Sequence, residues 1–290
     1  MNHKTPEKLS QEHWDTIIEP KSALFDLKIK EIRQYKDLLL LFVRRDLVAQ
    51  YKQTILGPLW YFVQPILTTL TYVLIFGNVA GLSTDGLPKM LFYLAGVTSW
   101  RYFSDSLTKT ADTFTRNAQI FGKVYFPRAI MPISVTITNL VTYGIQLLLF
   151  FAVYAYFVVS GEFQLSIQKE LFLFPILILV MMLLGLGFGF ILSALTTKYR
   201  DLKFLITFGV QLLMYGTPVI YPLSSIPEQY KVYIMANPMT SIIETFRYMF
   251  LGTGALDYGQ LLYSALFAII LFIFGLAIFN RTEKNFMDTV

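Results

Sequence analysis

Apolar residues form long blocks along the chain, and short polar stretches separate these blocks. Seven blocks are apparent, at residues 56–80, 90–103, 130–159, 171–197, 204–221, 233–251 and 261–279. A helix needs about 20 residues to cross the hydrocarbon core of a bilayer. Because a backbone in lipid must satisfy its own hydrogen bonds, blocks of this length are expected to be helices. The pattern predicts an all-α integral membrane protein whose topology depends on how many blocks cross.

Lysine and arginine are unevenly distributed among the loops between these blocks. The loops at 81–89 and 160–170 hold one lysine each, and the turn at 198–203 holds three basic residues. The loop at 105–128 holds Lys109, Arg116, Lys123 and Arg128. Loops rich in lysine and arginine remain in the cytoplasm. The distribution therefore places the N-terminus and the basic loops on the cytoplasmic side.

Residues 233–251 form the one block that carries opposite charges. It includes Asn237, Pro238, Glu244 and Arg247. Charges in lipid are costly unless they pair and face protein. If this block crosses, the tail with Arg281 and Lys284 lies outside, and if it enters and returns, the tail lies inside. We favour the second alternative, which predicts six transmembrane helices and a re-entrant segment at 223–256 between the fifth and the sixth.

The residues before the first block have the pattern of an amphipathic helix. Apolar residues recur at helical spacing, at Ile32, Tyr35, Leu39, Phe42, Val43 and Leu47. The polar positions include Lys30, Arg33, Lys36, Arg44 and Arg45. This pattern is typical of a basic helix in the lipid headgroup region. Since Pro58 disfavours helical backbone at Gly57, we expect a bend there.

This amphipathic helix has two interpretations. It is either a positively charged anchor for the first span or a lever that moves the span in response to a cytoplasmic partner. The chain is accordingly divided into a cytoplasmic tail with the interface helix (1–55), a six-span transmembrane domain (56–280) and a second cytoplasmic tail (281–290).

Composition excludes several classes of site. Of the 290 residues, 55% are hydrophobic and only 15% are charged, whereas soluble domains carry about 25% charged residues. Cysteine is absent, and both histidines, His3 and His13, lie in the N-terminal tail. No disulfide, thiolate metal site or other metal site is expected. The excess of basic residues, 24 against 19 acidic, fits cytoplasmic loops rather than nucleic-acid binding. The first thirty residues lack an apolar core and do not form a signal peptide.

Two stretches resemble one family. The first, "RRDLVAQYKQTILGPLWYFVQP", begins at Arg44, and the second, "GTPVIYPLSSIPEQYKVYIMANPMTSIIETFRYMFLG", begins at Gly216. Together they resemble the membrane subunits of ABC exporters for polysaccharides of the O-antigen, capsule and teichoic-acid type. The similarity extends over almost the whole chain. It implies six spans, an N-terminal interface helix, a re-entrant helical pair between spans five and six, and a homodimer that binds two separate ATPase subunits.

The chain has no ATP-binding loop of its own. Its single Gly-Lys pair, Gly122–Lys123, is followed by Val124, so the G-x-x-x-x-G-K-[ST] motif is absent. ATP and magnesium are therefore expected in the partner subunit, and this chain has no cofactor. The resemblance implies export of an undecaprenyl-type lipid-linked glycan, with O-antigen favoured, across the bacterial cytoplasmic membrane. Export of teichoic acid, capsule, a drug or a lipid by a related permease is the alternative. A membrane-embedded glycosyl- or acyltransferase is disfavoured because the spans lack cysteine and histidine.

The end of the second span carries a ladder of alternating charges. Its members are Arg101, Asp105, Lys109, Asp112 and Arg116. At helical spacing they share one face, and each has an opposite charge about one turn away. The ladder either neutralises itself or borders an aqueous vestibule. In the second case Arg101 is the candidate for the diphosphate of a lipid-linked substrate, because guanidinium offers paired donors to phosphate.

Two spans have polar aromatic faces. One face consists of Tyr61, Thr68, Tyr72 and Phe76, and the other of Phe204, Phe208, Gln211 and Tyr215. Such residues commonly pack between helices or form interfacial belts. Alternatively, their apolar rings and polar tips line a path for a glycan. The resemblance favours this alternative, since it implies a channel between the first and fifth spans of two protomers.

The segment 112–128 combines aromatic and basic residues. It is either a loop on the headgroups or, by resemblance, the coupling helix that docks on the ATPase with exposed aromatic side chains. The predicted contacts with the ATPase are Arg44, Arg45, Tyr51, Ile120, Phe121, Lys123 and Tyr125. In the fourth span, Gly185, Gly189 and Ser193 share one face, which predicts close helix packing.

Overall fold

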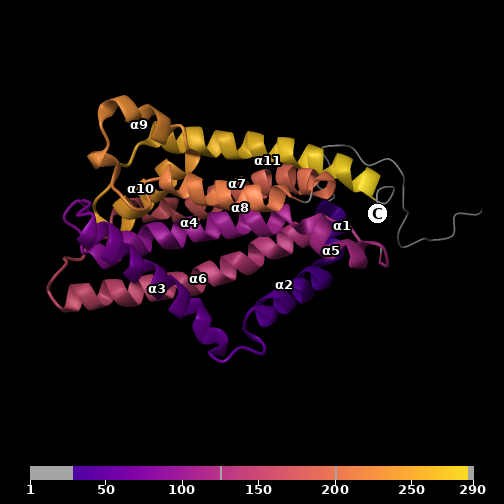
Figure 1. Ribbon diagram of the computed structural model, residues 1–290, viewed down its shortest axis with the longest axis horizontal. Helices are drawn as coiled ribbons and strands as arrows, with labels where there is room; N and C mark the ends of the chain where they lie inside the picture. The colour runs from indigo at the N-terminus through magenta and orange to yellow at the C-terminus, as the bar shows by residue number, and fades with distance from the viewer. Residues whose placement is uncertain (1–28, 125, 200, 287–290) are drawn as a thin grey trace, which may run out of the picture.

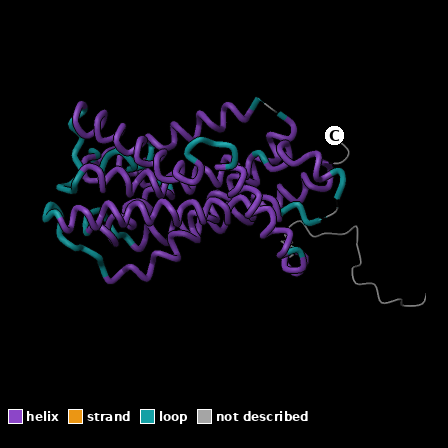
Figure 2. Tube along the Cα trace, turned by 90° about the horizontal axis from the view of Figure 1, so that it is seen from below, coloured by secondary structure: helices purple, strands orange, loops and turns teal. Residues whose placement is uncertain are grey.

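The computed structural model describes residues 29–124, 126–199 and 201–286, and these ranges contain helices, turns and loops but no strand (Figure 2). The longest helices run side by side along the molecule (Figure 1). They are α4 (Lys89–Ala111), α6 (Ile130–Val159), α7 (Phe174–Lys198) and α11 (Tyr258–Phe286). The shorter helices are α1 (Ile29–Gln34), α2 (Lys36–Tyr51), α3 (Trp60–Tyr72), α5 (Thr113–Phe121), α8 (Leu202–Tyr215), α9 (Glu228–Met235) and α10 (Pro238–Leu251).

Two irregular segments extend α3 at its ends. The 3₁₀ turn Gly57–Leu59 precedes it, and the π-helix Val73–Val79 continues it. A π-turn widens the helix and alters its hydrogen-bonding pattern. The carbonyl oxygen of Gly77 accepts a hydrogen bond from Lys89 Nζ at 2.8 Å. Lys89, the first residue of α4, thereby holds the end of this span against the next one.

Four described stretches are long and apolar enough to cross a membrane. They are Gly57–Val79, Ile130–Val159, Lys169–Lys198 and Tyr258–Glu283, and they match the predicted first, third, fourth and sixth spans. The predicted second span, α4, has sufficient length at 23 residues but carries charges. The predicted fifth, α8, has 14 residues, which extend about 21 Å at 1.5 Å per residue. An integral membrane protein is confirmed, and crossing by α4 and α8 remains a prediction.

Helix α4 can carry polar residues inside a membrane protein because other helices of the protein surround most of it. Sixteen of its 23 residues are buried, and it packs against α6 and α7. On α7, a Cβ added at Gly185 would lie 2.8 Å from Ser106 Cβ, and one at Gly189 would lie 2.4 Å from Thr110 Cβ. The predicted packing role of these glycines is therefore confirmed.

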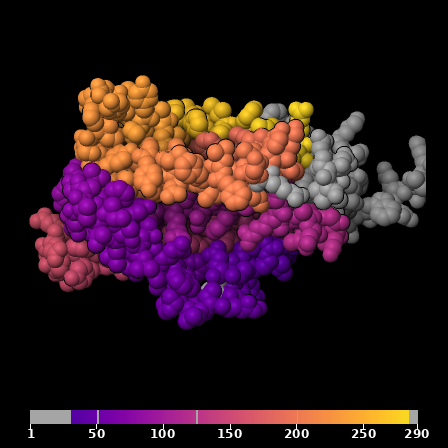
Figure 3. Space-filling model, in the orientation of Figure 1, coloured from indigo at the N-terminus to yellow at the C-terminus, as the bar shows by residue number. Residues whose placement is uncertain are grey.

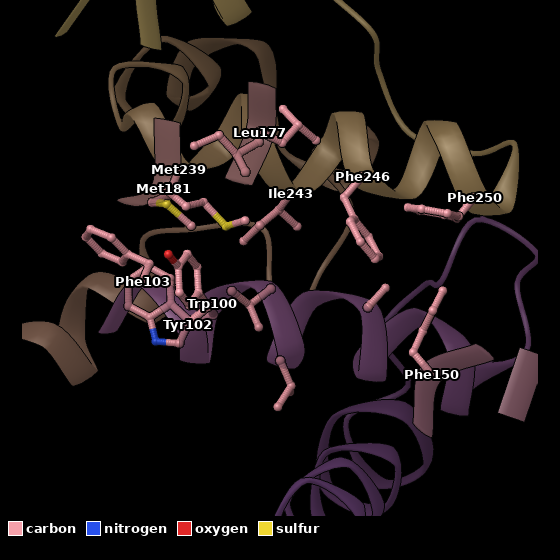
Figure 4. Close-up of a cluster of buried hydrophobic side chains, with 14 of the residues drawn as sticks. Trp100, Tyr102, Phe103, Phe150, Leu177, Met181, Met239, Ile243, Phe246 and Phe250 are labelled. Atoms are coloured by element: carbon pink, nitrogen blue, oxygen red, sulfur yellow. The ribbon is translucent and has the colours of Figure 1, made fainter. Parts of the chain in front are cut away.

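The main core lies where α4, α6, α7 and α10 meet. Phe246 and Phe250 of α10 contact Phe150 of α6, with ring centroids 5.4 Å and 6.0 Å apart (Figure 4). Trp100 and Phe103 of α4 belong to the same cluster. This core holds α10 against the long helices over its whole length, because Tyr248 is its single residue that is not buried.

Apart from the loop between α2 and α3, the loops fall into two groups at opposite ends of the molecule (Figure 1). One end carries the basic loops 105–128 and 198–203 and is called the basic end. There, Phe114 of α5 stacks on Phe279 of α11 with ring centroids 4.7 Å apart, and Lys203 pairs with Asp112 at 2.9 Å. At the opposite end, Ser224 Oγ donates to Asp85 Oδ1 at 2.8 Å, and Gln168 N donates to Met249 O at 2.9 Å. The loops predicted to share a side of the membrane therefore lie together.

The segment 223–256 begins and ends at the opposite end. Helix α8 ends there, α9 and α10 follow, and α11 starts there (Figure 1). Asn237 caps α10, since its Oδ1 accepts from Met239 N at 3.0 Å and Pro238 follows it. Gly252 ends α10 with φ +69°, the left-handed conformation that favours glycine. The observed helical pair agrees with a segment that does not cross, while its depth in the membrane remains a prediction.

The opposite charges of α10 form a buried ion pair. Arg247 Nη1 lies 3.1 Å from Glu244 Oε1, and their side chains are 1% and 4% exposed. Arg247 also donates to Pro218 O at 2.6 Å and to Val219 O at 2.8 Å, and its guanidinium lies 3.7 Å from the ring centroid of Phe92. Glu244 Oε2 accepts from Ala255 N at 3.2 Å. The prediction that these charges pair and face protein is confirmed.

Helix α2 is amphipathic only in part, because Leu40 and Leu41 are exposed. Phe42 and Val43 are buried, whereas Arg44 and Arg45 are exposed. Helix α2 lies against α6 and meets the α3 span at a corner that contains Gly57 (Figure 1). The predicted bend is present there.

The aromatic residues of segment 112–128 correct one expectation. Phe114, Phe121 and Phe126 are not exposed, because they are buried in a second core cluster with Phe42 and Phe279. Arg128 lies over the ring of Phe121 and donates to the carbonyl of Glu283. At the basic end, aromatic side chains from distant segments cover one another, which the sequence pattern did not indicate.

Candidate functional site

A cavity of about 570 Å³ lies between the α2–α3 corner, α4 and α6. Asp46, Gln50, Thr54, Trp60, Tyr61 and Gln64 line it from the corner. Charged residues of α4 and α5 form one wall, and polar residues of α6 form another. Ligand sites commonly have about 300–1,000 Å³ with a few polar groups. This cavity is therefore the candidate functional site.

The corner owes its shape to local backbone chemistry. Gln53 and Gly57 have φ values of +66° and +52°, and Pro58 follows Gly57. A positive φ reverses the chain direction at little steric cost for glycine. Tyr61 Oη donates to Leu47 O at 3.3 Å, which ties the start of α3 to α2. The corner thus encloses one side of the cavity.

The charged wall contains the first three members of the predicted ladder. Arg101 Nε and Lys109 Nζ lie 3.9 Å and 3.5 Å from Asp105 Oδ2. Lys109 Nζ also donates to Asn139 Oδ1 of α6 at 2.9 Å. Two cations therefore share one carboxylate.

The other two members depart from the prediction. Helix α4 ends at Ala111, and Asp112 pairs with Lys203 of α8 rather than with a ladder neighbour. Arg116 lies on α5, lines the cavity and forms no ion pair within the described part of the chain. The idea that the ladder neutralises itself is therefore wrong for Arg116. Three cations and two carboxylates, those of Asp46 and Asp105, line the cavity, and Asp46 is paired with Arg45 at 2.8 Å.

The neutral wall was not predicted. It consists of Val135, Thr138, Asn139, Thr142 and Gln146 of α6. Asn139 Nδ2 donates to Ser106 Oγ at 3.3 Å, so it bonds α4 at both ends of its amide. The signal in the sequence is the spacing of Asn139, Thr142 and Gln146 by three and four residues inside an apolar block, which places them on one helix face.

The cavity brings together some of the predicted site residues. Tyr61 and Arg101 both line it. Tyr72 and Phe76 are half-buried, with ring centroids 5.5 Å apart, and Tyr72 Oη lies 3.4 Å from Met214 Sδ of α8. Thr68 Oγ1 donates to the Gln64 carbonyl within α3. These residues therefore lie along one span without forming a single continuous lining in this chain.

The aromatic face of α8 lies on the surface. Phe204, Phe208 and Tyr215 are 82%, 58% and 44% exposed, and Gln211 is also exposed. Figure 3 shows α8 and α3 together on the near face of the molecule. The α8 residues do not reach the cavity. Whether they line a channel remains a prediction.

The predicted coupling residues are found in different environments. Arg44, Arg45 and Lys123 are exposed, Ile120 is half-buried, and Phe121 is buried. The side chain of Tyr51 and the whole of Tyr125 lie outside the described residues. The exposed basic residues and Ile120 remain candidates for contact with a partner.

Residues 37–251 match the family described as ABC-2 type transporter. The chain belongs to the ABC-2 type transporter family. This permease is 31% identical over 252 residues to the O-antigen export system permease protein RfbA of Klebsiella pneumoniae, with 87% of this chain and 94% of that protein covered. The RfbA protein of Myxococcus xanthus is 29% identical over 265 residues, which cover 90% of this chain and 98% of that protein.

A more distant relative comes from capsule export. The polysialic acid transport protein KpsM of Escherichia coli is 23% identical over 253 residues, with 84% of this chain and 93% of that protein covered. The predicted resemblance to permeases of polysaccharide exporters is therefore confirmed. This permease is a multi-pass membrane transport subunit, in agreement with its apolar helices.

Proposed function

We propose that this permease is the membrane subunit of an ATP-driven exporter that moves a lipid-linked polysaccharide of the O-antigen class across the cytoplasmic membrane. The observation that carries this proposal is the charged cavity beside the α2–α3 corner, in a chain whose O-antigen export relatives align over nearly their whole length. Capsule polysaccharide is the second candidate, because KpsM aligns over a similar length.

The proposed topology has six spans. They are the α3 span with its π-helix, then α4, α6, α7, α8 and α11. Helices α9 and α10 enter from the outer face and return, and both termini are cytoplasmic. The lysine and arginine distribution supports this orientation, because the basic end carries α5 and the C-terminal part of α11.

The proposed complex is a homodimer with two separate ATPase subunits that bind ATP and magnesium. The missing phosphate-binding loop supports a separate motor. Helix α5, together with exposed residues of α2, contacts this motor. Its stroke reaches the spans through the stacked rings of Phe114 and Phe279 and through the α2–α3 corner. The exposed face of α8 and the α3 span then border the channel between the two protomers.

The cavity holds the head of the substrate. Arg101 and Arg116 offer guanidinium donors to the diphosphate, and phosphate suits their planar geometry. The undecaprenyl-type lipid remains beside the exposed apolar side of the α3 span, at Leu67, Leu70 and Leu74. The glycan follows its diphosphate into the channel, where aromatic rings contact sugars without binding any unit tightly.

Removal of this permease from its host tests the proposed function. The polymer is expected to accumulate inside the cells and to disappear from the surface, and the full-length chain restores export. Composition analysis of the retained polymer distinguishes O-antigen from capsule. Normal surface polymer with no internal accumulation contradicts the proposal.

A further inference from the structure

Gln146 is a buried amide whose side chain has no hydrogen-bond partner in the described part of the chain. It is 3% exposed, and its side chain lines the cavity between the two walls. It also lines a small neighbouring hollow that shares Arg101 and Asn139 with this cavity and is further lined by Tyr102 and Tyr143. The amide has no protein partner and faces the cavity, so a group that enters the cavity can form hydrogen bonds with it.

The neighbours of Gln146 do not supply those partners. Asn139 is occupied by Lys109 and Ser106. The hydroxyl of Thr142 donates to Thr138 O at 3.1 Å, which leaves its oxygen free to accept. The hydroxyl groups of Tyr102 and Tyr143 are buried and do not open into the cavity. On the α6 wall, the amide of Gln146 and the oxygen of Thr142 are therefore the neutral groups left for a ligand.

We propose that Gln146 anchors a subsite for the sugar attached to the lipid diphosphate. This inference rests on the proposed function, and it assigns the two walls different parts of one substrate. The cations of α4 and α5 hold the phosphates, and the neutral wall of α6 binds the adjoining sugar. Gln146 offers two donors and an acceptor, which matches hydroxyl groups that both donate and accept.

Two features of the cavity favour a sugar over a second phosphate at Gln146. The α6 wall itself carries no cation, since its lining residues are Val135, Thr138, Asn139, Thr142 and Gln146. Arg101, which lines the small hollow together with Gln146, is already assigned to the diphosphate. A phosphate in a site of low polarity requires charge-assisted bonds. Trp60 and Tyr61 line the corner on the other side, and their rings suit the apolar C–H face of a sugar.

The test uses the purified complex of this permease with its ATPase subunit in lipid nanodiscs. Two probes are compared by binding affinity: undecaprenyl diphosphate without sugar, and the lipid-linked glycan isolated from cells that lack the permease. The variant is Gln146→Met, which keeps the chain length and removes the amide. The control is Gln229→Met, at an exposed residue of α9 outside the cavity.

The wild-type complex is expected to bind the glycan-bearing lipid more tightly than the bare lipid. Gln146→Met loses about five- to tenfold in affinity for the glycan-bearing lipid, as expected for one or two hydrogen bonds, and keeps its affinity for the bare lipid. Gln229→Met retains the wild-type preference. If Gln146→Met does not assemble, Gln146→Asn withdraws the amide by one methylene and is expected to reduce the preference in the same direction.

Two results overturn the subsite without affecting the proposed function. One is an equal affinity of the wild type for both lipids, and the other is a preference that survives in Gln146→Met or, if that variant does not assemble, in Gln146→Asn. In both cases Gln146 is satisfied by water or serves only packing. A wild-type complex that binds neither lipid contradicts the proposed function itself, so the two failures are distinguishable.

Discussion

Two helices of this permease carry opposite charges one turn apart, but the two charge clusters differ in their burial and in their partners. In α10, Glu244 and Arg247 are both buried. Four polar contacts, one between the two side chains and three with backbone groups, surround them together with the ring of Phe92. In α4, Arg101 and Lys109 share Asp105 at 3.9 Å and 3.5 Å and face a cavity. Their side chains are 23% and 32% exposed.

The difference separates a structural charge from a binding charge. Arg247 holds the two carbonyl groups that Pro218 and Val219 present after α8 ends, so its charge joins α10 to the preceding loop. Arg101 has one long contact and room beside it. A charge inside a membrane protein must be paired or solvated, and here one is paired by protein whereas the other is left for water or a ligand.

The largest expected effect is on folding. In Arg247→Met, the Glu244 carboxylate loses its cation and the two carbonyl oxygens lose their donor. Removal of one partner from a buried pair typically costs about 3–5 kcal/mol. We expect loss of monodisperse protein after detergent extraction, measured by size-exclusion chromatography and thermal unfolding. Arg247→Met with wild-type thermal stability would remove the distinction between the two charge clusters.

The second expected effect is on export, with little change in stability. Arg101→Ala is expected to reduce export about ten- to a hundredfold, because charge-assisted hydrogen bonds contribute about 1.5–3 kcal/mol. Arg101→Lys keeps the charge without the paired donors and is expected to retain part of the activity. Surface polymer and thermal stability are measured together. Full export by both variants shows that Arg101 does not handle substrate.

A smaller loss of stability is expected from a substitution on α4 that crowds the buried Glu244–Arg247 pair. A Cβ at Gly96 of α4 would lie 2.8 Å from Val219 O and 2.9 Å from Arg247 Nη2. Gly96→Ala is therefore expected to destabilise the protein by about 1–3 kcal/mol through overpacking. Gly144→Ala on α6 is the matched control, since no atom lies within 4 Å of its added Cβ. Equal thermal stability of the two variants would contradict the tight packing of α4 around Arg247.

The smallest effect is expected at the basic end. Asp112 and Lys203 are 2.9 Å apart, but their side chains are 38% and 37% exposed. Exposed pairs contribute about 0–1 kcal/mol, and salt screens them. Asp112→Asn is expected to change thermal stability by less than that amount and to leave export intact at high ionic strength. A loss of thermal stability as large as that of Arg247→Met would show that the exposure of an ion pair does not predict its contribution to stability.

The charged α4 wall of the candidate site could be predicted from the sequence, but its neutral α6 wall could not. The helical spacing of Arg101, Asp105 and Lys109 predicts one charged face. Asn139, Thr142 and Gln146 share a face for the same reason, yet an apolar block containing a few polar residues does not reveal what lies opposite them. The partner of that face is fixed by contact between α4 and α6, which no local pattern encodes.

By itself, the sequence determined the class of protein, the strongly apolar spans, the bend at Gly57 and the pairing of Glu244 with Arg247. Each depends on neighbours within a few residues, where helical geometry and backbone preferences act. Tertiary structure alone decided that Asp112 pairs with Lys203, that Phe114, Phe121 and Phe126 are buried, and that a cavity separates α4 from α6 beside the corner. These outcomes depend on which helices meet, because burial and long-range pairing are properties of contacts between segments far apart in the chain.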